Sequence, residues 1–166
     1  MTKVQHRLAW LVGLVLLQAL ILNNVHIGGY ATPFLYIYLL LKMPSDSSHI
    51  ELMLWAFFLG LAVDIFSDTP GMNAAAAVLM AFLRNGLLAL FLSRETTESI
   101  TPSTTSMGFT PFLKYMSACV LVHHAALLAL EYLSLAHGLT LLLRLVASAV
   151  LTGICIIGLE SINRKP

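Results

Sequence analysis

Apolar residues along this chain fall into six long runs separated by shorter polar stretches. A helix rises about 1.5 Å per residue, so roughly 20 apolar residues cross the ~30 Å hydrocarbon layer of a bilayer. The pattern therefore predicts an all-helical, polytopic membrane protein built as a single domain with six transmembrane helices. The predicted spans are 8–22, 30–41, 50–66, 72–92, 112–136 and 139–159.

The first two runs are shorter than a full span, and the second leaves an alternative open. Val25 and Ile27 can extend either run, and tilt or local thinning of the bilayer accommodates a short helix. If the run 30–41 were instead re-entrant, the chain would have five spans. We expect six.

The composition agrees with a membrane location. Hydrophobic residues make up 58% of the chain and charged residues 10%, whereas a soluble domain carries about 25% charged residues. The mean hydropathy is +0.87. The two cysteines, Cys119 and Cys155, lie within predicted spans, where we expect them to pack as small apolar residues. With a net charge of +1 and no basic patch, the chain is not expected to bind nucleic acid.

Lysine and arginine residues outside the spans occur in alternate loops only. Three loops, 23–29, 67–71 and 137–138, contain neither residue type. The positive-inside rule places the basic segments in the cytoplasm, so both termini are expected there, together with the Ser-, Thr- and Pro-rich loop 93–111. The basic residues that flank the spans on this side are Lys3, Arg7, Lys42, Arg94, Lys114, Arg164 and Lys165.

The predicted hairpin between the third and fourth runs carries the densest motif. Gly60 and Asp64 are four residues apart and share one helix face, and Gly71 ends an Asp68-Thr69-Pro70-Gly71 turn. A glycine on a helix face lets another backbone approach closely. Asp64 either contacts a partner, ion or substrate, or hydrogen-bonds a neighbouring helix and fixes the hairpin.

Arg84 falls inside the fourth predicted span, just before an Asn85-Gly86 pair that can loosen a helix. Its long stem allows the guanidinium group to reach toward the cytoplasmic surface or to bind inside the bundle. The other interpretation is a functional charge. Counted from the turn at 68–71, Arg84 and Asp64 differ in depth by roughly 12 Å at ~1.5 Å per residue, so we do not expect them to pair.

Glu131 and Arg144 lie at nearly equal distances on either side of the His137-Gly138 turn. Charges inside a membrane usually pair with one another or face the interior of the bundle. We therefore expect an intramembrane ion pair that clamps the last two helices together.

His123 and His124 are the nearest approach to a metal or proton-transfer site. Adjacent helical residues point about 100° apart, so this pair does not converge on one ion as histidines at i and i+4 do. Polar packing is the alternative interpretation. The sequence contains no His-Glu-x-x-His motif, nucleophile elbow, phosphate-binding loop or dinucleotide fingerprint. We therefore expect a protein without enzymatic activity, metal or cofactor.

The order of several short motifs resembles the bacterial rod shape-determining protein MreD family. The resemblance runs from the first predicted helix into the fourth, and beyond residue 93 it is limited to length and hydropathy. Asn85 stands where the family often has proline. The similar segments are Leu17-Gln18, Asn23-Asn24, Ala31-Thr32-Pro33-Phe34-Leu35-Tyr36, Gly60-Leu61-Ala62-Val63-Asp64, Pro70-Gly71 and Ala81-Phe82-Leu83-Arg84.

The resemblance implies a non-enzymatic scaffold of the cell-wall elongation machinery in the bacterial inner membrane. Proteins of this family bind MreC, a single-span protein, and through it a penicillin-binding transpeptidase, a SEDS glycosyltransferase and MreB filaments. Pro33, Gly60, Asp64, Gly71 and Arg84 are the residues it suggests for partner binding or for structure. The family fold is similar to the substrate-binding subunits of ECF-type transporters, so the alternative is a subunit that binds a small, vitamin-type molecule. Fold alone does not decide between these functions.

Overall fold

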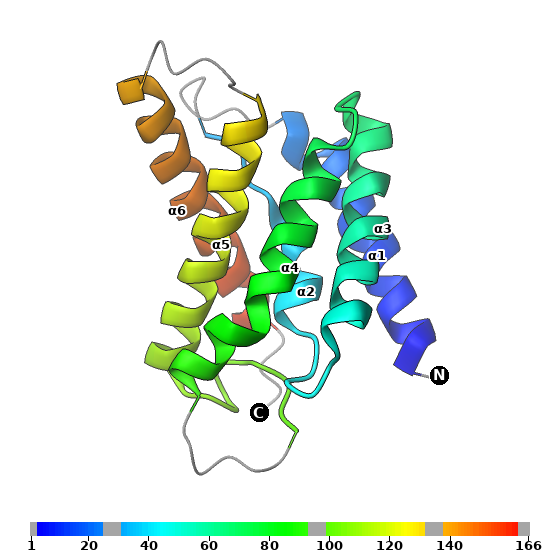
Figure 1. Cartoon of the computed structure of the whole chain (residues 1–166), viewed down its shortest axis with the longest axis vertical. Coiled ribbons are helices and arrows are strands. Elements are labelled where there is room, and N and C mark those ends of the chain that lie inside the picture. Colours follow the sequence, from blue (N-terminus) through cyan, green and yellow to red (C-terminus); the bar gives the residue numbers. More distant parts are fainter. Residues whose placement is uncertain (1–2, 25–30, 93–98, 132–137, 163–166) are drawn as a thin grey trace.

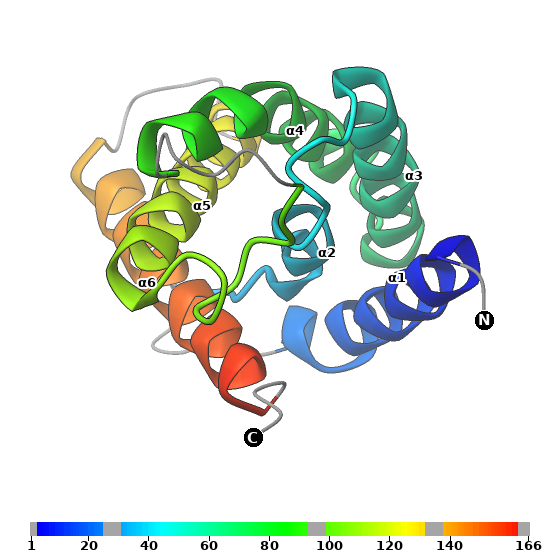
Figure 2. The same cartoon turned by 90° about the horizontal axis from the view of Figure 1, so that it is seen from below.

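Five long helices surround a short central segment in the computed structural model of the chain. The structure describes residues 3–24, 31–92, 99–131 and 138–162. Seen along the bundle, α2 lies near the middle of a ring formed by α1, α3, α4, α5 and α6 (Figures 1 and 2). The elements are α1 (Lys3–Leu20), η1 (Leu22–Asn24), η2 (Leu35–Ile37), α2 (Tyr38–Leu41), α3 (His49–Ser67), α4 (Met72–Phe91), α5 (Phe109–Glu131) and α6 (Gly138–Ile162).

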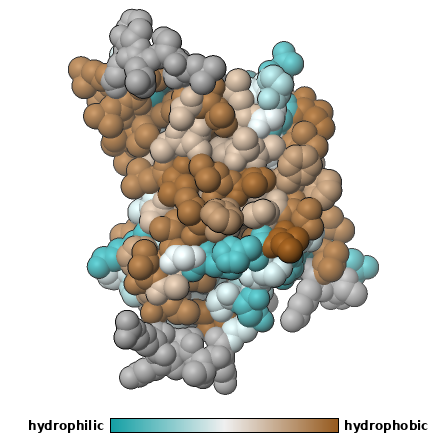
Figure 3. Space-filling model, viewed as in Figure 1, coloured by the Kyte–Doolittle hydropathy of each residue, from teal (hydrophilic) through white to brown (hydrophobic). Residues whose placement is uncertain are grey.

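The five long helices confirm that the fold is all-helical and suited to a membrane. Each is long and apolar enough to cross a bilayer, and together they match five of the six predicted runs as far as the described residues extend. Their outward side chains are apolar: Leu54, Phe58 and Val150 are all more than half exposed. Figure 3 shows the resulting hydrophobic belt, with a hydrophilic band at the end where α4 finishes and α5 begins.

The second predicted run does not form a long helix. Thr32–Phe34 is non-helical, and only a 3-10 turn and the four residues of α2 follow it. Pro33 accounts for the late start, because the residue before a proline is biased away from the helical region. The segment enters at the end of the bundle where α1 finishes and leaves at the end where α3 begins (Figure 1). Its side chains from Leu35 to Leu41 are at most 6% exposed.

The α3–α4 hairpin owes its tight turn to local capping. At the start of α3, the Ser48 side chain accepts a hydrogen bond from the Glu51 backbone N–H. At its end, Asp68 adopts a left-handed conformation with φ of 54°. Gly71 precedes α4 with φ of 78°, a value that glycine adopts without the steric penalty of a side chain.

Gly60 is the point of closest approach between α3 and α4. A Cβ atom added there would lie 2.5 Å from Ala74 Cα and 2.7 Å from the Asn73 carbonyl oxygen. Real carbon atoms do not approach so closely, so any side chain at this position would push the helices apart. The small residue predicted for close helix packing therefore packs against a helix of its own chain.

The described part of the predicted loop 93–111 closes one end of the bundle (Figure 2). It pairs with the α2–α3 connection, since the Ser45 N–H donates to the Ile100 carbonyl oxygen at 2.8 Å and the Ile100 N–H donates to Ser45 Oγ at 3.0 Å. Pro102 and the two residues after it are buried. The α5 helix begins at Phe109, three residues before the predicted start.

We predict that Gly60→Ala destabilises the protein by about 1–3 kcal/mol, the usual range for overpacking a well-packed site. Gly13→Ala is the matched control, because nothing lies within 4 Å of the added Cβ. Alanine is also the better helix former by roughly 1 kcal/mol, so the control should be neutral or slightly stabilising. Thermal unfolding in detergent, followed by circular dichroism, measures both. Equal melting temperatures for the two variants would contradict the close approach.

Candidate functional site

The central segment has a backbone without regular helical hydrogen bonds at its start, and side chains of the surrounding helices supply the partners. The Thr32 N–H donates to Ser148 Oγ at 3.1 Å, and the Phe34 N–H donates to Thr152 Oγ1 at 3.0 Å. Pro33 has no N–H to satisfy. An unpaired backbone group at membrane depth would cost several kcal/mol, so these hydroxyl groups allow the chain to stay unwound there.

Gln18 of α1 completes the hydrogen bonding at this point. Its Oε1 accepts from the Leu35 N–H at 2.9 Å, and its Nε2 donates to the Pro33 carbonyl oxygen at 2.8 Å. The same Nε2 donates to Asn23 Oδ1 at 2.9 Å. Gln18 is fully buried, so one side-chain amide links α1 to the backbone of both Pro33 and Leu35.

Arg84 performs the corresponding role at the other end of the central segment. It is fully buried, and its terminal nitrogens donate to the carbonyl oxygens of Leu41 (3.3 Å), Met43 and Pro44 (3.2 Å). Its Nε donates to Tyr115 Oη at 2.9 Å, and the Tyr115 hydroxyl donates to the Leu41 carbonyl oxygen at 3.3 Å. Arg84 thus binds inside the bundle rather than reaching toward the surface.

We call Gln18, Arg84, Tyr115, Ser148 and Thr152 the polar frame. These five side chains come from α1, α4, α5 and α6, and each binds the backbone between residues 32 and 44. Asn85 binds the backbone just beyond this segment, because its Nδ2 donates to the Ser47 carbonyl oxygen at 3.0 Å. The α4 helix continues unbroken through the Asn85-Gly86 pair that the sequence suggested as a loose point.

Asp64 caps the start of α4. Its Oδ1 accepts from the Asn73 N–H at 3.0 Å and from Thr69 Oγ1 at 2.7 Å, and its Oδ2 accepts from the Ala74 N–H at 2.9 Å. A carboxylate at a helix N-terminus meets free N–H groups and the positive end of the helix dipole. Of the two interpretations offered for Asp64, the geometry therefore favours the one in which it fixes the hairpin together with Gly71.

The two histidines face the bundle interior beside the central segment. Tyr36 Oη lies 2.6 Å from His123 Nε2 and donates to Asn73 Oδ1 at 3.2 Å. His124 contacts the Val120 carbonyl oxygen through Nδ1, at 2.8 Å. His123 Nδ1 has no hydrogen-bond partner in the part of the chain that the structure describes. No group of three metal-ligating side chains occurs there either, and the pair packs against the ring of Phe34.

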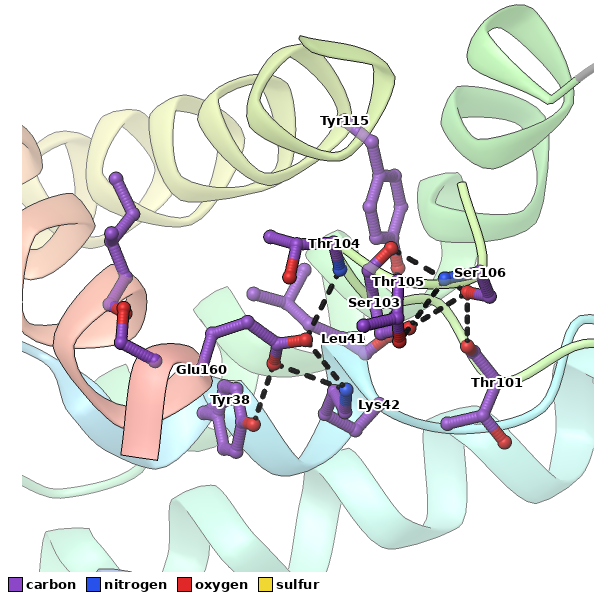
Figure 4. Close-up of polar contacts among 12 residues, drawn as sticks. Tyr38, Leu41, Lys42, Thr101, Ser103, Thr104, Thr105, Ser106, Tyr115 and Glu160 are labelled. Carbon is purple, nitrogen blue, oxygen red and sulfur yellow. Dashed lines mark hydrogen bonds and ion pairs between the residues drawn. The ribbon is translucent and has the colours of Figure 1, made fainter. Parts of the chain in front are cut away.

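A buried carboxylate that the sequence analysis did not single out lies at the end of α6. Glu160, 4% exposed, accepts from Tyr38 Oη at 2.9 Å, from Lys42 Nζ at 3.1 Å and from the Thr104 N–H at 3.1 Å (Figure 4). It ties α6 to α2 and to the closing loop. The sequence did contain one indication of this site: Tyr38 and Lys42 are four residues apart and so share one helix face, where both can bind the same carboxylate.

The described residues include the ion pairs Arg7–Glu51 and Lys42–Glu160. The ion pair expected between Glu131 and Arg144 stays a prediction. Glu131 is exposed at the last residue of α5. Equal distance from a turn fixes the depth of two residues but not their rotation about the helix axes. Two side chains on neighbouring helices need both the same depth and a matching rotation to form an ion pair.

The predicted candidates thus divide between two places. Asp64 and Gly71 lie at the α3–α4 turn, with Gly60 one helical turn away from Asp64, whereas Pro33 and Arg84 lie at opposite ends of the central segment.

No family model matches the chain, and neither the curated proteins nor the solved structures provide a match. The polar frame is an arrangement that holds the backbone of the central segment in place.

We predict that Arg84→Met costs at least about 2–3 kcal/mol of stability, because it leaves buried carbonyl groups without donors. Arg84→Lys should recover only part of the loss, since one ammonium group cannot reproduce the spread of donors of a guanidinium. Lys114→Met removes an exposed cation from α5 and should be near neutral. Chemical denaturation in detergent measures the three variants. A loss no greater for Arg84→Met than for Lys114→Met would contradict the assigned role.

Proposed function

We propose that this protein is a non-enzymatic scaffold of the bacterial cell-wall elongation machinery, located in the inner membrane and needed for rod shape. In this proposal it binds an MreC-like single-span protein and, through it, the wall-synthesising enzymes and MreB filaments. Its support is the MreD-like order of Pro33, Gly60, Asp64, Gly71 and Arg84. Each of these five residues lies where it shapes the bundle, as expected of motifs that preserve a framework.

The observation that carries the proposal is the filling of the bundle centre by the chain itself. A subunit that binds a vitamin-type molecule needs an internal cavity for its ligand, usually about 300–1,000 Å³. Here Tyr36, Ile37 and Leu40 of the central segment are fully buried in that position. This favours the scaffold over the alternative of a transporter subunit.

We also infer six membrane crossings with both termini in the cytoplasm. The partly extended central segment would provide the second crossing, because extended chain advances about 3.3 Å per residue against ~1.5 Å in a helix. Non-helical backbone at membrane depth requires burial within the protein, which this segment has. In support, α1 begins and α6 ends at the same end of the bundle, where α2 also ends and α5 begins (Figure 1). Lys42 directly follows α2, and Lys114 lies near the start of α5.

We predict the following labelling pattern in a background where both native cysteines are replaced by alanine. Single cysteines at Asn24 and Pro70 should react with an impermeant thiol reagent added to intact spheroplasts. A cysteine at Thr105, which is also exposed in the structure, should react only after the membrane is opened. Labelling at Thr105 from outside would rule out the inferred topology.

We predict that depletion of the protein in a rod-shaped host makes the cells round and leaves vitamin uptake intact. An MreC-like protein should be recovered with the tagged protein from native membranes, and complementation with Gly13→Ala should restore rod shape. The transporter alternative predicts instead a bound small molecule and lost uptake. Normal rods after depletion would remove the scaffold proposal.

A further inference from the structure

The described residues form a groove on the outer surface between α5 and α6. Its volume is about 310 Å³. Leu113 and Ile157 line it at the end where α5 begins, and Leu121 and Ala149 line the other end. Apart from Ser117, the side chains around it are apolar, so within a bilayer the groove faces hydrocarbon.

Two small residues of α6 leave this space open. Gly153 and Ala149 are four residues apart and therefore lie on one face of the helix. A Cβ atom at Gly153 would meet only Met116 Cε, at 3.5 Å, which is an ordinary contact distance. An added Cβ at Gly153 would therefore fit without a steric clash.

The dimensions of the groove fit one hydrocarbon chain better than a helix. From residue 113 to residue 121, α5 rises about 12 Å. A whole helix, roughly 10–12 Å in diameter, would need about 900 Å³ or more over that length, well above the volume of the groove. Only a row of side chains from a partner helix would enter, whereas an extended chain fits along the full length.

A cation stands beside the groove at the end where α5 begins. Lys114 is exposed and has no ion-pair partner among the residues described. It precedes Ser117 by three residues and Leu121 by seven, so all three lie on one stripe of the helix. Its ammonium group is placed near the headgroup level of a bilayer, where it complements a phosphate.

We propose that this groove binds one acyl chain of an anionic phospholipid from the surrounding bilayer, with the phosphate held by Lys114. The small residues Ala149 and Gly153 make room for the chain, and Met116 forms the floor. The site lies on the outside of the bundle and makes no use of the polar frame. It therefore stands independently of the proposed role in wall elongation.

Native mass spectrometry of the purified full chain tests the proposal with phosphatidylglycerol and phosphatidylethanolamine as probes. The unaltered protein should retain one phosphatidylglycerol molecule in preference to phosphatidylethanolamine. Gly153→Leu, which fills the groove, should lower phosphatidylglycerol binding about tenfold, a loss of about 1.4 kcal/mol. Lys114→Gln should keep binding but abolish the preference between the two lipids.

Gly158→Leu is the matched control, because this glycine of the same helix is exposed with nothing within 4 Å of an added Cβ. Its lipid binding should equal that of the unaltered protein. Ala149→Leu fills the groove from a second position and provides the same test if Gly153→Leu does not fold. Full retention of phosphatidylglycerol in a folded groove-filling variant would overturn the proposal. A second outcome would also overturn it: a groove-filling variant that keeps the lipid but no longer binds a co-expressed single-span protein. That result would show that the groove holds a partner helix and not an acyl chain.

Discussion

The structure depends on providing hydrogen-bond partners for a non-helical stretch of backbone in the apolar interior of the bundle, where no water can supply them. Residues 32–34 are non-helical, and the N–H groups of Thr32, Phe34 and Leu35 each donate to a side-chain acceptor on another helix. In an apolar interior the alternative is an unpaired group, which costs far more than the modest net gain of a hydrogen bond in water. The acceptors must therefore hold their positions, and this requirement determines how α1 and α6 are placed around the segment.

The same constraint explains a buried arginine that lacks a carboxylate partner among the described residues. Arg84 meets carbonyl oxygens at the point where α2 ends, and a helix leaves its last carbonyl groups unpaired there. The dipoles of these carbonyl groups together offset the positive charge of the guanidinium group. The Tyr115 hydroxyl accepts from Arg84 and donates to the Leu41 carbonyl oxygen, so it links the two. Glu160 and Lys42 close the neighbouring region as an ion pair, so they add no further net charge to the interior.

Sequence patterns predicted the elements whose formation depends on neighbouring residues in the chain. Long apolar runs gave the five helices, and the spacing of Gly60, Asp64 and Gly71 gave the tight hairpin. The partners of Glu160 and the carbonyl groups that bind Arg84 could not be predicted, because they come from segments 40 or more residues away. The pair expected between Glu131 and Arg144 stays a prediction for a related reason: depth can be counted along a helix, but rotation about its axis is set by packing. The non-helical start of the central segment was signalled only by Pro33.

A segment held in this way also limits where function can reside. Substituting a residue of the polar frame changes the support of residues 32–44, so its effects on any activity would arise through stability. Side chains on the outer surface have no such role, because they face lipid and form no hydrogen bonds to the backbone of the central segment. Features there that depart from a plain apolar helix surface are therefore the ones that need a separate explanation. The groove between α5 and α6 is such a feature, because a Cβ at Gly153 would make only an ordinary contact with Met116, and yet a glycine there leaves the space open.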